Sequence, residues 1–151
     1  MINTMAKKPL KYGIIDPCYK SRFFMELANA GVWTNQSGKF AIRSSNVAAL
    51  AASGSTELVG WAQVHAHTVA STGTFADIFN DANARFVIGV TGTYANTMRG
   101  KTCDLDTTTN IQTANVAASS TDVIVVYDGN ATLALAEVGL NPLKMFVTGV
   151  A

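Results

Sequence analysis

The sequence predicts a mainly β protein, a β-sandwich or small antiparallel β-barrel, with two or three short helices and an extended N-terminal arm. Short segments rich in β-branched residues fill its second half, turn residues separate them, and no helix-length apolar period lies between these late strands. Consecutive strands joined by short turns form sandwiches or barrels rather than parallel α/β sheets. We assign residues 1–20 to the arm and residues 21–151 to a single β-rich domain, and no internal repeat is apparent.

The arm shows neither helical nor strand periodicity. Pro9 and Pro17 bias the residues before them toward extended backbone. Fully extended, the first dozen residues would reach roughly 40 Å. The arm is therefore long enough to lie across a neighbouring subunit.

Three segments are predicted to form short helices. Residues 21–29 begin with a serine cap and place apolar residues at helical spacing. Residues 46–52 form an alanine-rich turn or two. Residues 75–84 carry an apolar stripe after a possible cap at Thr74.

Strands are predicted for most of the remaining chain. The strongest candidate is a C-terminal hairpin, in which residues 122–127 are nearly all β-branched, Asp128-Gly129 is a turn pair and residues 131–138 return. Leu140-Asn141-Pro142 then breaks the chain before a last strand. The other predicted strands are residues 32–34 and 39–43, joined by a hairpin loop at 36–38, and residues 57–69, 85–90 and 144–150.

Charge is sparse and unevenly distributed. Charged residues make up 14% of the chain and the net charge is +1. Residues 1–43 hold seven basic and two acidic residues, whereas residues 44–151 are net acidic. A basic leading segment on an acidic body favours docking onto an acidic partner or onto a neighbouring copy. The alternative is a solvated terminus that its lysines keep soluble.

No set of residues predicts catalysis, so we expect a protein that is not an enzyme and binds no cofactor. Cys18 and Cys103 form no Cys-x-x-Cys pair and are expected to be free, buried thiols. No Gly-x-Ser-x-Gly elbow and no phosphate-binding glycine loop is present. Nothing in the sequence brings a cysteine against a histidine.

Two patterns are weak candidates for a metal site. His65 and His67 would point to the same face of a strand, yet no third ligand lies nearby, and a polar strand face explains them as well. Asp104-x-Asp106 followed by Asn110 partly matches a calcium loop but lacks its glycine and closing glutamate. We therefore expect these aspartates to lie in a surface turn without an ion.

Membrane and direct nucleic-acid contacts are not expected. The longest uncharged stretch contains both histidines and several Ser, Thr and Gly residues, unlike a membrane span. The pI of about 7.8 and the acidic body lack the electrostatic footprint of a DNA-binding domain. The basic and aromatic residues near the N-terminus are instead expected to contact a protein partner. This partner-binding set is Lys7, Lys8, Pro9, Lys11, Tyr12, Phe23 and Phe24.

Four segments of the C-terminal third follow one another in a recognisable order: Gly100-Lys101-Thr102-Cys103-Asp104-Leu105, Asn110-Ile111-Gln112, Ser120-Thr121-Asp122-Val123-Ile124-Val125-Val126 and Leu140-Asn141-Pro142. With these segments, the C-terminal third resembles small virion proteins of tailed bacteriophages, especially capsid decoration (cement) proteins. The resemblance covers about residues 86–148 and includes no invariant chemical motif.

This resemblance implies a β-barrel or β-sandwich that binds the major capsid protein in many copies on the capsid exterior, after synthesis in the host cytoplasm. It also implies contacts with neighbouring copies, often as trimers. It provides no catalytic residues. The alternatives are a tail, head-completion or receptor-binding virion component, or a small carbohydrate- or metal-binding β module.

Overall fold

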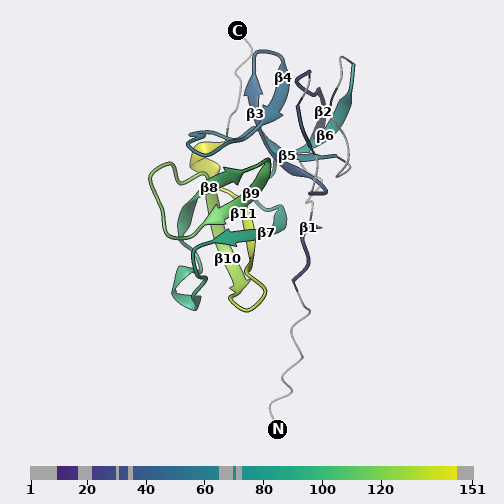
Figure 1. The fold of residues 1–151 in the computed structure, drawn as a ribbon. Coiled ribbons are helices and arrows are strands. Elements are labelled where there is room, and N and C mark those ends of the chain that lie inside the picture. Colours follow the sequence, from purple (N-terminus) through teal and green to yellow (C-terminus); the bar gives the residue numbers. More distant parts are fainter. Residues whose placement is uncertain are drawn as a thin grey trace.

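The computed structural model describes residues 10–16, 22–29, 31–33, 36–64, 70 and 73–145 of the 151-residue chain. These residues form eleven strands and two short 3-10 helices (Figure 1). The strands are β1 (Gly13–Asp16), β2 (Arg22–Glu26), β3 (Lys39–Ser44), β4 (Val47–Leu50), β5 (Gly60–Gln63), β6 (Phe75–Phe79), β7 (Arg85–Thr91), β8 (Thr102–Thr108), β9 (Ile111–Asn115), β10 (Ile124–Asn130) and β11 (Leu135–Leu140), and the helices are η1 (Asn96–Met98) and η2 (Pro142–Lys144). The prediction of a mainly β protein is confirmed.

The last five strands form a closed barrel, which we call the C-terminal barrel. Its order is β7-β11-β10-β8-β9, and β9 returns to pair with β7. This closing pair is parallel, whereas the other neighbours in the barrel are antiparallel. β1 adds to the free part of β7, with Gly13 opposite Val87 and Ile14 opposite Phe86.

Strands β2 to β6 form a second sheet, which we call the N-terminal sheet. Its order is β2-β6-β5-β3-β4. The two outer strands approach each other at one parallel bridge between Leu27 and Ala48, where the Ala28 N–H donates to the Ala48 carbonyl at 2.8 Å. The sheet is thus curved almost into a second barrel, with a single bridge at its seam.

The N-terminal sheet and the C-terminal barrel repeat one topology. In each, the first strand lies beside the fifth, the fifth beside the fourth, the fourth beside the second, and the second beside the third. The registers also agree: Lys39, Ala62 and Ile78 lie opposite one another across three strands, as do Cys103, Ile124 and Leu140. The expectation of no internal repeat is therefore wrong at the level of structure. The two regions repeat the same strand pairing, although their side chains differ.

Two hydrophobic cores follow from the alternation of side chains. Ala41, Ala62 and Ile78 face the interior of the N-terminal sheet. On its opposite face Phe40 and Trp61 pack onto the core of the C-terminal barrel. The Trp61 ring stacks on Phe86 with 4.7 Å between centroids, and the Phe40 ring meets Trp61 edge-on at 5.0 Å.

A buried polar network completes this contact. The fully buried Gln112 amide donates to the carbonyls of Phe40 and Ala51 at 2.8 and 2.9 Å and accepts from the Phe40 N–H at 2.7 Å. The Gln36 side chain bonds the Gln112 main chain in both directions. Lys39, also fully buried, donates to the carbonyl of Asn110. These bonds fix the β8–β9 hairpin against β3.

The three predicted helices are wrong, because all three segments contain strands. Residues 21–29 contain β2, residues 46–52 contain β4 and residues 75–84 contain β6. In β6, Ala76 and Ile78 are buried while Phe75 is exposed, which is the two-residue period of a strand. Such short segments gain little as helices, so pairing with neighbouring strands decides their structure.

Several strand boundaries also differ from the prediction. Asp128-Gly129 is not a turn but lies inside β10, opposite Glu137 and Ala136 after a bulge, and the turn is at residues 131–134. The Tyr94 ring lies so close to Gly129 that a Cβ there would be 2.6 Å from it. Gly129 is therefore required because the Tyr94 ring leaves no room for a side chain, and not because the chain turns there.

The remaining strand predictions have mixed outcomes. The strand at residues 85–90 is confirmed as β7, and the one at 39–43 as β3, although β3 pairs with β4 and β5 rather than with residues 32–34. Only Gly60–Gln63 of residues 57–69 forms a described strand. In residues 144–150, Lys144 ends η2 and Met145 bridges to Leu58, while the rest lies outside the described residues.

Candidate functional site

The described part of the predicted arm is attached to its own chain. The Tyr12 hydroxyl donates to the Gly38 carbonyl at 2.6 Å, and its ring lies 6.0 Å from that of Trp61. Burial raises the pKa of the Tyr12 hydroxyl well above its usual range. Gly13–Asp16 continues from this residue as β1, although no strand was expected there. Tyr12 thus packs within its own chain, at the contact between the N-terminal sheet and the C-terminal barrel.

The other predicted partner-binding residues are distributed differently. Lys11 is exposed beside this attachment point. Phe24 lies on β2 with an exposed fraction of 70%, and Phe23 belongs to the same strand. Lys7, Lys8 and Pro9 lie outside the described residues.

Phe24 belongs to an apolar patch that sequence reasoning found only in part. Phe75 on the neighbouring strand β6 has an exposed fraction of 58%. Because Phe24 pairs with Asp77 and Glu26 pairs with Phe75, the two rings are diagonal neighbours on one face. We call Phe24 and Phe75 the aromatic patch. Phe75 was missed because its segment was interpreted as a buried helix stripe.

Charged groups border the aromatic patch on the same two strands. The Arg22 guanidinium lies 3.8 Å from the Asp77 carboxylate. The Glu26 carboxylate accepts from the Gly73 N–H at 2.8 Å. An apolar centre with charges of both signs around it is typical of a protein contact surface.

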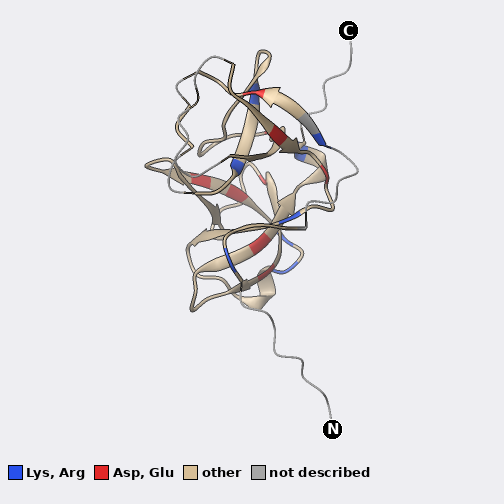
Figure 2. Ribbon diagram, turned by 90° about the vertical axis from the view of Figure 1, so that its right-hand side faces the viewer, with Lys and Arg blue, Asp and Glu red and all other residues tan. Residues whose placement is uncertain are grey.

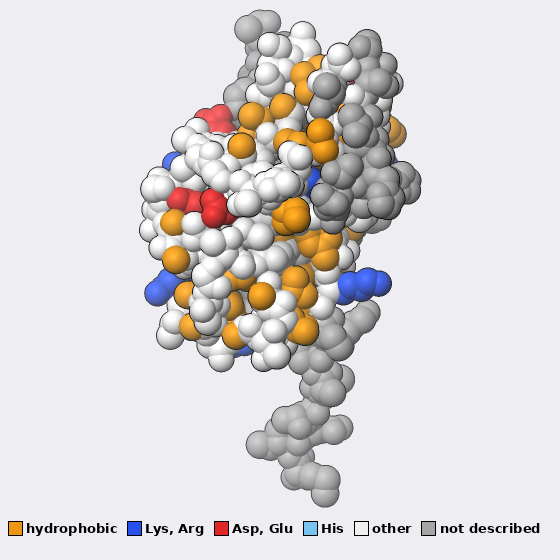
Figure 3. Space-filling view, in the orientation of Figure 1, with side chains coloured by type: hydrophobic (Ala, Val, Ile, Leu, Met, Phe, Trp, Pro, Cys, Tyr) orange, Lys and Arg blue, Asp and Glu red, His pale blue; other side chains and the backbone are white. Residues whose placement is uncertain are grey.

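The described part of the surface carries few charged side chains. Acidic and basic residues are scattered along the ribbon (Figure 2), and neutral and apolar atoms dominate the face seen in Figure 3. In the described part of the chain, no helix has the length and apolar character needed to cross a bilayer. The surface fits close contact with other protein, where few charges need to be desolvated.

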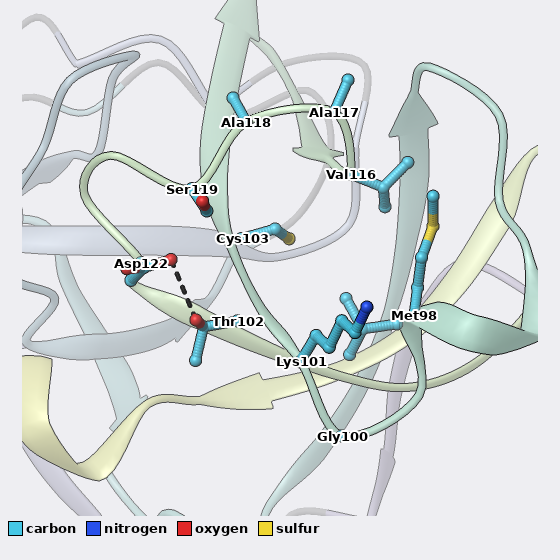
Figure 4. A pocket seen from close by; sticks show the side chains of 11 residues that line it. Met98, Gly100, Lys101, Thr102, Cys103, Val116, Ala117, Ala118, Ser119 and Asp122 are labelled. Carbon is cyan, nitrogen blue, oxygen red and sulfur yellow. Dashed lines mark hydrogen bonds between the residues drawn. The ribbon is translucent and has the colours of Figure 1, made fainter.

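A pocket of about 460 Å³ opens beside β8, between η1 and residues 116–119 (Figure 4). Thr102 and Asp122 line it and are joined by a hydrogen bond of 2.9 Å, and Lys101 lies at its rim. Burial, with smaller contributions from the Asp104 and Asp122 charges, raises the pKa of the Cys103 thiol to about 12. This cysteine is therefore a protonated thiol at neutral pH, not an activated nucleophile.

The two aspartates of the possible calcium pattern lie on strand β8, not in the expected surface turn. The Asp104 carboxylate accepts from the Ser120 hydroxyl at 2.6 Å and from the Thr121 N–H at 2.7 Å. Burial alone would raise the pKa of Asp104, but these hydrogen bonds outweigh it and hold the pKa well below its usual range. Asp106 instead bonds Ser53, so the two carboxylates serve different loops.

Metal ligands are not gathered among the residues that the structure describes. No group of three His, Cys, Asp or Glu side chains there is able to hold an ion. His65 and His67 lie outside the described residues, so their role as weak candidates is untested.

Comparison with family models and with curated proteins found no match to this chain.

Proposed function

We propose that this chain is a virion structural protein that decorates and stabilises a bacteriophage capsid by binding major capsid protein subunits. The observation that carries the proposal is the attachment of residues 10–16: β1 pairs with β7 and Tyr12 bonds Gly38. Lys7 and Lys8 precede this attached segment in the sequence, and Lys11 within it is exposed. A basic segment of sequence beside an attached strand of a sparsely charged body suits an acidic patch on a repeated protein surface.

Binding to several neighbouring subunits at once would support the same role. A capsid offers each copy several neighbours, so weak individual contacts add through effective concentration. The resemblance of residues 86–148 to decoration proteins agrees with this proposal. The expected location is the capsid exterior, with one copy contacting capsid subunits and neighbouring copies of itself.

The direct test is co-sedimentation of labelled protein with preformed capsids. We expect the full chain to sediment with the capsids in many copies and a chain lacking residues 1–9 to bind more weakly. The deletion leaves Tyr12 and β1 in place, so a loss of binding would not reflect loss of this attachment. If the full chain stays in the supernatant at low and physiological salt, the proposal is wrong.

A matched pair of charge reversals separates the arm from general electrostatics. Lys8→Glu should weaken capsid binding several-fold, whereas Lys101→Glu, at an exposed position of the C-terminal barrel, should not. Added salt should reduce the difference, because it screens exposed charges. Copy number in purified particles distinguishes decoration from a tail or head-completion role: hundreds of copies favour decoration and a few contradict it.

A further inference from the structure

The pocket beside β8 lies at the mouth of the C-terminal barrel (Figure 4). Two connections enclose it, one from β7 to β8 through η1 and one from β9 to β10. Because β7 and β9 are parallel, the connections that follow them leave the same end of the barrel. Barrel mouths are common places for small-molecule sites, and a volume of about 460 Å³ is within the range of such sites.

The buried part of the pocket lining is apolar. Cys103 and Val126 line the pocket and are 3% and 1% exposed. Met98 and Val116 also line it and pack against the same hydrophobic core. The Cys103 thiol is protonated at neutral pH, so it adds a neutral surface and not a charge. This part of the lining therefore suits the C–H groups of a ligand.

The outer part of the lining is polar. Asp122 and Thr102 are partly buried, and Ser119 is exposed. The Thr102 hydroxyl donates to the Asp122 carboxylate at 2.9 Å (Figure 4). This bond leaves the lone pairs of the Thr102 oxygen and further acceptor sites of the carboxylate for a ligand. The pocket thus offers hydrogen-bond acceptors from Asp122 and Thr102, and a Ser119 hydroxyl that is able to donate as well.

Asp122 is held in place by its own loop. Its φ of 55° lies in the left-handed region, which is uncommon for a residue with a side chain. Its N–H donates to the Asp104 carboxylate at 2.9 Å, and its carbonyl accepts from the Asn141 side chain at 2.6 Å. Residues held in such a conformation cluster at functional sites, and a carboxylate fixed in advance binds a ligand at a lower ordering cost.

The charges of the lining select against an ionic ligand of either sign. Asp122 disfavours an anion, and the Lys101 ammonium at the rim disfavours a cation. A wholly apolar ligand would cover the Asp122 carboxylate without giving it a hydrogen bond. The lining therefore favours a neutral ligand that has several hydroxyl groups and an apolar face.

We propose that this pocket binds one hexopyranose residue of a saccharide. The sugar hydroxyls donate to the Asp122 carboxylate and to the Thr102 oxygen, and a C–H face of the ring packs on Met98 and Val116. The bonds to Asp122 are charge-assisted and are the strongest of these contacts. A single sugar makes few such bonds, so we expect a Kd on the order of millimolar.

An NMR titration of the full chain, labelled at its amide and methyl groups, tests the site. The probes are N-acetylglucosamine and the methyl pyranosides of glucose, mannose and galactose. At least one of them should shift the methyl signals of Met98, Val116 and Val126 until these signals saturate. Glycine, methylammonium and inorganic phosphate are the charged controls and should not shift them. If no sugar shifts these signals, or if a charged control saturates them instead, the proposal is wrong.

Asp122→Asn tests the assigned acceptor. Asparagine tolerates the left-handed backbone and still accepts from Thr102, but it removes the charge, so the affinity for the sugar should fall about tenfold. Glu57→Gln, which removes an exposed carboxylate outside this pocket, should leave the affinity unchanged. Equal affinities of the two folded variants would overturn the proposal. Circular dichroism checks their folding, and if Asp122→Asn is unfolded, the titration of the wild type decides.

The saccharide site and capsid binding are tested separately. The titration uses the isolated chain, whereas co-sedimentation uses preformed capsids. A chain that sediments with capsids but binds no sugar refutes only the saccharide site, and the reverse result refutes only the capsid role.

Discussion

The N-terminal sheet and the C-terminal barrel share strand order and register but differ in how they close. In the barrel, three parallel pairs, from Gly89 with Thr113 to Thr91 with Asn115, join the first and third strands. In the N-terminal sheet the same two strands meet at a single bridge, Leu27 with Ala48. One pattern of strand pairing thus supports both a barrel closed by a ladder and a sheet whose described outer strands meet at one bridge.

The cores of the two regions also differ in the volume of their side chains. The N-terminal core contains many alanines, among them Ala41, Ala48, Ala62 and Ala76, whereas the barrel core contains Phe86, Ile88, Leu105 and several valines. Alanine buries less apolar surface than a branched or aromatic side chain, so each strand contributes less to the N-terminal core. The barrel core also gains the aromatic residues from the opposite face of the N-terminal sheet. The two regions therefore share a register but differ in core volume and in the ladder that closes them.

The largest expected effect is at the contact that joins the two regions. Trp61→Ala should destabilise the protein by about 3–5 kcal/mol, because a fully buried ring that stacks on Phe86 is replaced by a cavity. Urea unfolding followed by circular dichroism measures this. Phe75→Ala, which removes an exposed ring, should cost less than about 0.5 kcal/mol. Equal costs would show that Trp61 does not join the two regions.

The buried amide at the same contact should have the next largest effect. Gln112→Ala leaves the buried Phe40 N–H without its partner and removes one of the two donors to the Phe40 carbonyl, at an expected cost of about 1–3 kcal/mol. Asn83→Ala is the control, because Asn83 is an exposed amide and should cost much less. The difference in unfolding midpoint between the two variants is the measurement. Similar unfolding midpoints would contradict the role of the buried Gln112 amide at this contact.

The two closing seams should differ in hydrogen exchange. The Ala28 N–H closes the N-terminal sheet and the Val116 N–H, which donates to Thr91, extends the closing ladder of the barrel. We expect Ala28 to exchange at least about tenfold faster, because a single bridge opens without breaking a ladder. Amide exchange measured by NMR at neutral pH provides the comparison. Comparable protection at both sites would remove the asymmetry proposed between the two regions.

The smallest expected effect concerns pH and the barrel alone. Because the pKa of Asp104 is lowered in the folded protein, its carboxylate stabilises the fold above the unfolded pKa of about 3.9, and this contribution is lost as pH falls toward the folded pKa. Asp104→Asn should therefore cost about 1 kcal/mol at pH 7 and flatten the loss of stability below about pH 4. Ser120→Ala, which removes one donor, should give a smaller change in the same direction. An unchanged pH profile in Asp104→Asn would contradict this role.

Part of the candidate surface could be predicted from the sequence. Phe24 was singled out as a partner contact and is exposed, whereas Tyr12, chosen for the same reason, is partly buried and packs against Trp61. Both are aromatic residues near the basic segment, so local sequence gives no means of separating them. Which ring is covered depends on a strand pairing between β1 and β7, about seventy residues apart in the chain.

What the sequence determined by itself is the β-rich class, the strand at β7 and the sparse charge, because composition and two-residue alternation are local properties. Tertiary structure alone decided that the three expected helices are strands, that one topology occurs twice, and that the two copies close differently. The physical reason is that short segments such as β2, β4 and β6 have weak local preferences, so their conformation is decided by hydrogen bonds and packing supplied by residues distant in the chain.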